Sequence, residues 1–401
     1  MSAIEVTAMT PARSDATDEP HSATEVTAMN TTKDAAMSAT PPIATTPAEI
    51  TTQWLTRVFR HLGHDVQVGS VTSTPIGTGQ SAHSERFALS YTRWDGVAPM
   101  TLVAKLPHPD PTSRATGHVH GSYRREAGFY REIAATVQVR IPRCYYADID
   151  ANSDFVLLLE DLAPARQGDQ MLGCTLAVAQ RALIEIARLH APRWGDPQLF
   201  THTFLAGAGG APGDPASVPR DMYETFWQGF LARYRDRLTP EIIQVGAGLL
   251  QDFDTWSRAY PGARCVTHGD YRLDNVLIDS RAGRIDLAVV DWQTAGVGCG
   301  ASDVAYFLGA GLLPEARRAG EQDLLRHYHD ALRAGGVTGY PFDALWQDYV
   351  WYTYSGYVMA VVASMLVVQT TRGDELFVTM AQRHGQHALD LDAAGLLAQS
   401  R

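Results

Sequence analysis

The sequence predicts an α+β fold with a small, β-rich N-terminal lobe at residues 46–162 and a larger, mostly helical lobe at residues 163–401. Two observations carry this prediction. Short apolar stretches separated by turn residues fill residues 66–106, a pattern typical of antiparallel strands. Beyond residue 176, most apolar residues recur instead at spacings of three and four, which is typical of helices that bury one face.

Composition narrows the classes of function. The 401 residues are 45% hydrophobic and 19% charged, which is ordinary for a soluble globular protein. The net charge is −11 and the basic residues are not clustered, which argues against nucleic acid or an anionic membrane as the main partner. The four cysteines include no C-x-x-C pair, which favours a reducing cytoplasm and no zinc site.

One uncharged stretch, residues 349–371, raises the question of a membrane span. Its densely apolar part covers only residues 358–368, whereas a spanning helix needs roughly 20 predominantly apolar residues. The first residues also lack the basic and apolar regions of a secretory signal. We therefore expect a buried helix in a cytoplasmic protein with no membrane partner.

Residues 1–45 are predicted to form a disordered tail. They contain few aromatic residues and many Ala, Thr, Ser and Pro residues, so they cannot bury enough apolar surface to fold. Residues 2–9 recur almost unchanged as residues 22–29, and Met29 or Met37 is an alternative start of translation.

The N-terminal lobe is predicted to begin with a helix at residues 46–63. Thr46, Pro47 and Glu49 form a capping box with proline at the first helical position. The following apolar residues give this helix one buried face, and Gly63 ends it. Three strands are expected next, at residues 66–76, 87–91 and 100–106.

The turn between the first two strands is rich in glycine. Gly77, Gly79 and Ser81 occupy it, in the place where a kinase covers the phosphates of its nucleotide with a glycine-rich loop. Glycines in a hairpin turn also occur for backbone reasons alone, so this turn is weak evidence by itself.

Two charged residues of this lobe are candidates for an ion pair. Lys105 lies on the third strand, and Glu126 lies on a helix predicted at residues 122–137. Such pairs arise by chance, but kinases place a phosphate-binding lysine and its carboxylate partner in this order. Two more strands are expected at residues 141–146 and 155–159, and the second ends at Glu160, Asp161 and Leu162.

The second lobe is predicted to be mostly helical, with a glycine- and proline-rich loop at residues 207–219. A hairpin is expected at residues 276–278 and 287–290. The helices are expected at residues 176–190, 221–238, 240–260, 302–308, 315–334, 340–370 with a break at Gly356, and 374–399.

The polar stretch from His268 to Asp279 organises this lobe. Asp270 and Asn275 lie five residues apart in a loop that runs into a short apolar strand, and Asp291 ends the next strand. In kinases, an Asp in such a loop accepts the proton of the attacking hydroxyl, while an Asn and a second Asp hold Mg²⁺ against the nucleotide phosphates. A chance turn explains His-Gly-Asp alone, but it does not explain Asn275 and Asp291 in register.

The details of this loop resemble one kinase superfamily. Protein kinases have His-Arg-Asp here and Asp-Phe-Gly afterwards, whereas this chain has Gly269 and then Asp291-Trp292-Gln293. This variant resembles the aminoglycoside phosphotransferase and choline kinase superfamily, over about residues 70–310. This loop variant and the segment Tyr123-Arg124-Arg125-Glu126 are most similar to those of the ecdysteroid-kinase-like branch. The chain also resembles the kinase half of enzymes that phosphorylate 4-hydroxyacyl-CoA.

The resemblance implies a bilobal, protein-kinase-like fold and an enzyme that uses Mg²⁺ and ATP or GTP to phosphorylate a hydroxyl group of a small molecule. It implies that the backbone of the segment after the fifth strand meets the adenine edge. His190 is expected to have a structural role under the catalytic loop, and His268 is expected to brace that loop. Asp303 is expected either to cap the helix at residues 302–308 or to hold the catalytic loop. The implied site residues are Asp270 and Arg272 for catalysis, Gly77, Gly79, Ser81, Lys105, Glu126, Glu160 and Leu162 for the nucleotide, and Asn275 and Asp291 for Mg²⁺.

Other functions remain open at this stage. A nucleotide-binding pseudokinase that serves as a scaffold is one alternative, although such proteins usually lack one of Lys105, Asp270, Asn275 and Asp291. A protein kinase is another, but the chain lacks an Ala-Pro-Glu segment and room for a long activation loop. The sequence leaves the oligomeric state undecided.

The acceptor is predicted from two signals that disagree. Net acidity favours a cationic acceptor such as an aminoglycoside, whereas the uncharged stretch suggests an aromatic wall for an apolar one. Long-range charge effects are screened within about 8 Å at physiological salt, so local pocket chemistry should dominate. We expect a hydroxyl on a largely apolar skeleton, such as a hydroxyacyl thioester or a sterol-like alcohol. The candidate residues for the wall are Trp351, Tyr352, Tyr354 and Tyr357, and packing in the core is the alternative explanation for these aromatic residues.

Overall fold

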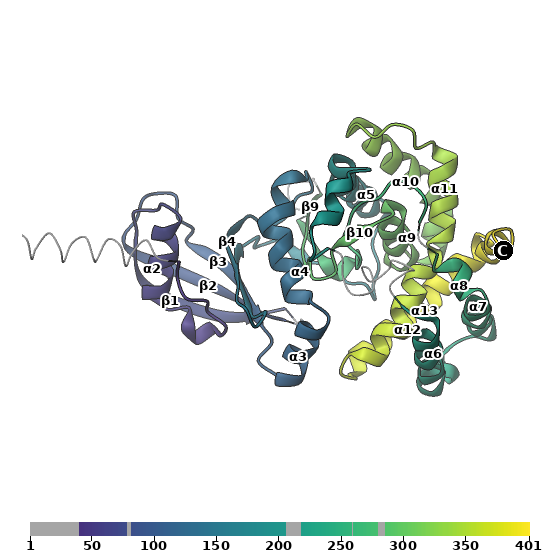
Figure 1. Ribbon diagram of the computed structural model, residues 1–401, viewed down its shortest axis with the longest axis horizontal. Helices are drawn as coiled ribbons and strands as arrows, with labels where there is room; N and C mark the ends of the chain where they lie inside the picture. Colours follow the sequence, from purple (N-terminus) through teal and green to yellow (C-terminus); the bar gives the residue numbers. More distant parts are fainter. Residues whose placement is uncertain (1–39, 78–81, 206–217, 259, 280–284) are drawn as a thin grey trace, which may run out of the picture.

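The structure is a computed structural model that describes residues 40–77, 82–205, 218–258, 260–279 and 285–401. It confirms the α+β fold with two lobes. The β-sheet lies at one end of the molecule, and the helices of the second half of the chain gather at the other (Figure 1). Helix α4 (Ser122–Gly128) lies between them and contacts β4 (Cys144–Ile149) and β5 (Phe155–Glu160).

A five-stranded antiparallel sheet forms the N-terminal lobe, in the order β1-β2-β3-β5-β4. Its middle strand, β3, carries Lys105, which pairs in register with Ser84 on β2 and with Leu157 on β5. A central strand is bonded on both sides, so the position of Lys105 is fixed by the sheet. The first three strands are β1 (Gln67–Ile76), β2 (Ala82–Arg93) and β3 (Thr101–Pro107).

One helix, α2 (Thr52–His61), packs its apolar residues against this sheet. Leu55, Val58 and Phe59 are fully buried in a cluster with the side chains of the strands. The predicted helix at residues 46–63 is therefore two pieces, because a 3₁₀ turn at Pro47–Glu49 precedes α2. Thr51 separates them, and its hydroxyl caps α2 by accepting a hydrogen bond from the Trp54 backbone N–H at 3.2 Å.

The N-terminal boundary of the folded part also differs from the prediction. The tail was expected to reach residue 45, but Ala44 is fully buried against α2 and the sheet. The indole Nε1–H of Trp54 donates to the Pro42 carbonyl oxygen at 2.6 Å. The composition of residues 40–45 did not indicate these contacts, because Ala and Pro are common both in disordered tails and in packed extended segments.

The helix predicted at residues 122–137 changes its winding part-way. It begins as α4, widens into a π-helical turn at Phe129–Ile133 and tightens into a 3₁₀ turn at Ala134–Thr136. A preceding helix, α3 (Pro111–Val119), was not predicted. It is short and polar, and Asp110 caps it by accepting a hydrogen bond from Ser113 N at 2.8 Å.

The C-terminal lobe is helical as predicted. One apolar cluster runs from β5 and the residues around α4 into α5 (Leu176–His190), α9 (Gly300–Gly311) and α10 (Pro314–Ala334). A second cluster joins the outer helices. These are α6 (Arg220–Tyr234), α7 (Pro240–Gln251), α8 (Phe253–Trp256), α11 (Phe342–Trp351), α12 (Thr353–Leu366), α13 (Thr371–Asp390) and α14 (Ala393–Ala398).

Several predicted helices are divided differently. The stretch 340–370 breaks at Tyr352 rather than at Gly356, which lies inside α12. Residues 240–260 and 374–399 each form two helices. Within the described part of the chain, no helix is long and apolar enough to cross a bilayer.

Two small sheets carry the polar loop. The predicted hairpin is confirmed as β8 (Val276–Asp279) and β9 (Asp286–Val289). A third strand, β6 (Arg166–Gln167), pairs with the other edge of β8. The other sheet pairs β7 (Cys265–Thr267) with β10 (Gly296–Gly298). The loop from His268 to Asn275 therefore starts at the end of one sheet and enters the other.

Candidate active site

The loop from His268 to Asn275 is held by buried side chains beneath it. The two carboxylate oxygens of Asp303, on α9, accept hydrogen bonds from His268 N at 2.7 Å and from Gly269 N at 2.9 Å. The fully buried His190 ring lies 3.1 Å from Asp303 Oδ2, and the His268 ring nitrogen Nε2 lies 3.0 Å from the Val290 carbonyl oxygen. These three residues brace the loop, and of the two roles expected for Asp303 the contacts show the one that holds the loop.

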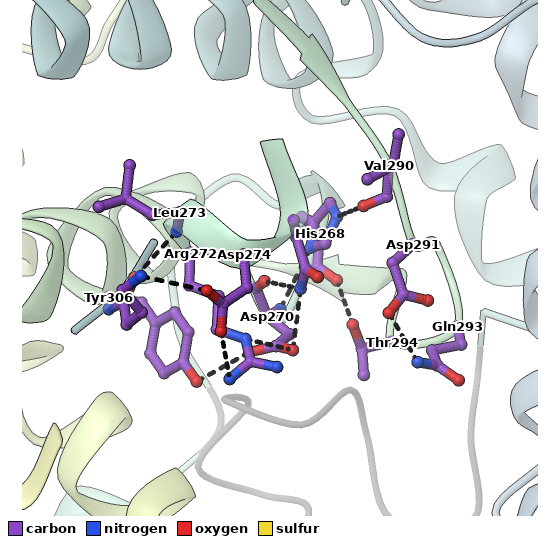
Figure 2. A network of polar contacts seen from close by, with 12 residues as sticks. His268, Asp270, Arg272, Leu273, Asp274, Val290, Asp291, Gln293, Thr294 and Tyr306 are labelled. Atoms are coloured by element: carbon purple, nitrogen blue, oxygen red, sulfur yellow. Dashed lines mark hydrogen bonds and ion pairs between the residues drawn. The ribbon is translucent and has the colours of Figure 1, made fainter. Parts of the chain in front are cut away.

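Asp270 lies at the centre of this loop with partners on both carboxylate oxygens (Figure 2). Oδ2 accepts a hydrogen bond from Asn275 Nδ2 at 3.0 Å and lies 3.2 Å from Arg272 Nε. Oδ1 accepts a hydrogen bond from the Tyr306 hydroxyl at 2.8 Å. The carboxylate thus lies in a defined plane, with its remaining lone pairs available to an incoming hydroxyl.

Asp291 follows β9 and has a left-handed backbone conformation, with φ 71°. A non-glycine residue rarely adopts this conformation, and such strain collects at functional sites. Asp291 Oδ1 lies 2.7 Å from Lys105 Nζ, and Oδ2 accepts a hydrogen bond from Gln293 Nε2 at 2.8 Å. Burial opposes ionisation of Asp291, but the Lys105 ammonium more than offsets it, so the pKa of Asp291 lies below its ordinary value.

Lys105 lies between two carboxylates. Its Nζ is 2.8 Å from Glu126 Oε1 as well as 2.7 Å from Asp291 Oδ1. Burial disfavours the ammonium form, but the two carboxylates outweigh burial and raise the pKa of Lys105 above its ordinary value. The predicted contact between Lys105 and Glu126 is present, and the bond to Asp291 links the two lobes.

The residues after Asp291 are packed rather than free. The Trp292 ring is fully buried and stacks on Phe129, with ring centroids 3.8 Å apart and planes inclined by 4°. Trp292 N donates to Glu126 Oε1 at 3.3 Å, and Arg125 Nη1 donates to the Gln293 carbonyl oxygen at 3.0 Å. The π-helical turn that contains Phe129 thus meets the segment that carries Asp291.

The structure describes the predicted nucleotide residues only in part. Gly77 has φ 74°, a conformation that favours glycine, whereas Gly79 and Ser81 lie outside the described residues. The Glu160 carboxylate is held by both terminal nitrogens of Arg140, at 3.0 Å each, so this side chain points to the protein. Leu162 follows it at the rim of the cleft.

A cleft of about 1320 Å³ lies between the lobes and contains these groups. At one end it is lined by Lys105, Glu126, Asp291, Asp270 and Asn275. Apolar residues of the sheet and of the hinge, which is the segment at residues 160–162 after β5, lie around them. At the other end it is mostly apolar. The apolar residues there come from the start of α6 and from the α12–α13 hairpin, and they are Val218, Met222, Val358, Met359, Val362, Ala363, Leu366, Val367, Leu376, Phe377 and Met380. Thr370, Arg372 and Gly373 also line this end, and Arg372 is its charged residue among those described.

The predicted aromatic wall is wrong in its residues. Tyr352, Tyr354 and Tyr357 are almost completely buried in the apolar clusters, with exposures of 3%, 4% and 0%. The uncharged stretch does reach the cleft, but through the opposite face of α12, which presents Val358, Met359 and Val362. A helix that is apolar on every side gives no signal of which face lines a cavity.

Three residues of the site were not predicted. Tyr306 contacts Asp270, Gln293 contacts Asp291, and Arg125 holds the segment after Asp291. Gln293 and Arg125 lie beside recognised motif residues, which was an available signal. Tyr306 lies 36 residues from Asp270 on a helix of apolar residues, and nothing local marks it.

Comparison with known proteins agrees with this geometry. Residues 74–345 match the model of one protein family, described as the phosphotransferase enzyme family and abbreviated APH. The chain belongs to the phosphotransferase enzyme family. The matched range includes Lys105, Glu126, Asp270, Asn275 and Asp291, and this chain is a small-molecule phosphotransferase. The predicted superfamily is confirmed, whereas the ecdysteroid-kinase-like branch stays a prediction.

Among solved structures, a microcompartment-associated aminopropanol kinase has a TM-score of 0.51 at 15% identity, covering 85% of this chain and 99% of that one. A candidate aminoglycoside phosphotransferase from Ralstonia eutropha has a TM-score of 0.46 at 17% identity, covering 82% and 93%. The GDP and kanamycin complex of an APH(2″) enzyme has a TM-score of 0.45 at 13% identity, covering 87% and 98%. A search of curated proteins found no match. The aminopropanol kinase likeness supports the kinase-like fold alone.

Proposed function

We propose that this phosphotransferase moves the γ-phosphoryl group of ATP or GTP to a hydroxyl group on a largely apolar small molecule. One observation carries the proposal. The cleft holds the Lys105, Asp291 and Asp270 cluster at one end and an apolar wall at the other. Phosphoryl transfer needs positioning and charge neutralisation more than covalent chemistry, and the polar end offers both.

The nucleotide is assigned to the N-terminal part of the cleft. Ala82 and Val103 of the sheet line this part of the cleft, as do Leu277 and Val290. Apolar surfaces suit a flat base, and the backbone at Glu160 and Leu162 is assigned to its edge. Lys105 then points to the phosphates.

The donor set fits Mg²⁺. Asn275 directs both amide hydrogens at Asp270, at 2.8 Å to O and 3.0 Å to Oδ2, which leaves its carbonyl oxygen for a cation. Asp291 supplies anionic oxygen. Mg²⁺ takes most of its remaining ligands from phosphate and water, so two protein oxygens are enough to hold it. When bound, Mg²⁺ neutralises charge on the phosphates.

Asp270 is the proposed base. Its carboxylate is fixed by Asn275 and Tyr306, so it orients the acceptor hydroxyl and accepts its proton as the phosphoryl group is transferred. Arg272 lies between Asp270 and Asp274, at 3.2 Å and 3.7 Å. We assign Arg272 to binding of the γ-phosphate. To bind it, the guanidinium group leaves one of these two carboxylates and pairs with phosphate oxygens instead.

The acceptor is assigned from the chemistry of the far end of the cleft. None of the described cleft residues contributed by α6, α12 and α13 is acidic. A polycation such as an aminoglycoside would therefore leave its ammonium groups without carboxylate partners there. Burial of an apolar skeleton instead stabilises the complex by about 25 cal/mol per Å².

An acceptor screen tests this function. The protein is incubated with Mg²⁺, ATP and a set of neutral alcohols, sterol-like alcohols, hydroxyacyl thioesters and aminoglycosides, and products are identified by the mass gain of one phosphate. We expect apolar alcohols or hydroxyacyl thioesters to be phosphorylated, and Asp270→Asn to form little product. Phosphorylation of aminoglycosides alone would contradict the assigned acceptor.

A further inference from the structure

Tyr306 reaches the catalytic carboxylate from the side of the acceptor. It lies on α9, is 4% exposed, and lines the cleft between Asp270 and the apolar wall. Its hydroxyl donates to Asp270 Oδ1 at 2.8 Å, whereas Asn275 and Arg272 hold the other oxygen, Oδ2 (Figure 2). The two oxygens of the base thus have separate anchors on different structural elements.

The ring of Tyr306 is itself held in place. It stacks on the His384 ring of α13, with centroids 5.4 Å apart and planes inclined by 25°. His384 is fully buried between two glycines, because an added Cβ at Gly309 or Gly356 would lie 2.3 Å or 2.0 Å from its ring atoms. Helices α9, α12 and α13 therefore meet at one tightly packed point behind the Tyr306 ring.

We propose that Tyr306 is a positioning residue for phosphoryl transfer, which fixes the plane of the Asp270 carboxylate toward the acceptor hydroxyl. This inference rests on the proposed function of Asp270. The terminal torsion of an Asp side chain is broad, so an anchor on one oxygen alone leaves the plane free to turn. A second anchor on Oδ1 removes that freedom before the acceptor arrives, which lowers the cost of reaching a reactive geometry.

Tyr306 remains a donor in this role. Burial raises the pKa of Tyr306 well above its ordinary value, and the Asp270 carboxylate raises it further. The hydroxyl therefore keeps its proton at physiological pH and does not compete with Asp270 as a base.

Tyr306→Phe tests the proposal, because it removes one oxygen and leaves the ring stack intact. A hydrogen bond to a charged group contributes about 1.5–3 kcal/mol, so we expect kcat to fall by about 10- to 100-fold. The KM values for nucleotide and acceptor should stay within about twofold. Tyr357→Phe is the matched control, since it removes a buried hydroxyl that donates to the Ile242 carbonyl oxygen at 2.9 Å; its kcat should match wild type.

A double-mutant cycle with Asp270→Ala separates positioning from direct contact with the acceptor. If Tyr306 acts through Asp270, Tyr306→Phe has no further effect on the residual rate of Asp270→Ala. Additive losses, a wild-type kcat for Tyr306→Phe, or a change confined to the acceptor KM would each overturn the proposal. A wild-type protein that phosphorylates no acceptor would overturn the proposed function itself, and this inference with it.

Discussion

Asp270 is held by partners on both of its carboxylate oxygens. Asn275 and Tyr306 hold its two oxygens, and replacement by Asn would keep the size and most of these bonds. We predict that Asp270→Asn lowers turnover by about 100-fold or more, because general-base assistance is lost. Nucleotide affinity measured by calorimetry should be unchanged. A variant with near-normal turnover would show that Asp270 is not the base.

Asp291 is the anionic member of the proposed Mg²⁺ pair. It is held at φ 71° with Lys105 and Gln293 on its two oxygens. We predict that Asp291→Ala abolishes the effect of Mg²⁺ on nucleotide affinity, since water replaces the ligand but not its charge. Titrations of wild type and variant, each with Mg²⁺ and with a chelator, measure this. The assignment fails if Mg²⁺ tightens nucleotide binding equally in both proteins.

The buried His384 predicts how stability depends on pH. Burial, together with the nearby Arg317 and Arg383, lowers the pKa of His384 to about 3, whereas an unfolded histidine has a pKa near 6.5. Between these values the unfolded chain binds a proton that the folded chain does not, so stability falls as pH falls below 6.5.

The slope of this decline is about 1.4 kcal/mol per pH unit for one histidine. The unfolding free energy should fall between pH 6.5 and pH 5 in both proteins. We predict that this decline is less steep in His384→Phe than in wild type, by about 1.4 kcal/mol per pH unit. Denaturant unfolding at several pH values measures it. An unchanged slope in the variant would mean that the folded state also protonates His384.

At the scale of elements, α12 sets the chemistry of the acceptor end. Its Val358, Met359 and Val362 line the cleft, while Tyr354 and Tyr357 face the core. We predict that Val362→Asp raises the KM of an apolar acceptor by about tenfold or more, because a charge then lies unpaired against an apolar skeleton. Nucleotide affinity should not change.

Val368→Asp is the control for this substitution. Val368 lies just beyond α12, is 65% exposed and does not line the cleft, so the same change in charge should leave the acceptor KM unaltered. Equal effects of the two variants would indicate a long-range charge effect rather than a pocket wall.

Elements also differ in how well the sequence predicts them. The catalytic loop was predictable because Asp270 and Asn275 are local, and five residues of loop bring both to one point. The strands and most helices followed from apolar spacing. The breaks at Tyr352 and Thr51 did not, since no Gly or Pro marks either position.

Contacts between distant segments explain the remaining errors. The bond between Lys105 and Asp291 spans 186 residues, and that between Tyr306 and Asp270 spans 36. Neither contact can be predicted from the spacing of its two residues in the sequence, because the tertiary fold brings these side chains together. The face of α12 was misassigned for the same reason, since only packing decides which side of a wholly apolar helix turns inward.

At the scale of the whole molecule, the two lobes meet through both an ion pair and apolar packing. Lys105 on the sheet lies 2.7 Å from Asp291 in the helical lobe, and Trp292 stacks on Phe129 at the same junction. The sheet and α4 thus supply one half of the site, and the polar loop supplies the other. The cleft between them runs from the hinge to the apolar wall, and the central claim is that an apolar alcohol occupies that wall.

A matched pair of acceptors tests this claim most directly. The two alcohols share one skeleton and differ only in that one carries a protonated amine, and kcat/KM is measured for each with saturating Mg²⁺ and ATP. We predict that the neutral alcohol is preferred by about tenfold or more, because an unpaired charge is costly in an apolar site. A preference for the amine, or faster phosphorylation of kanamycin than of any neutral alcohol, would contradict the account.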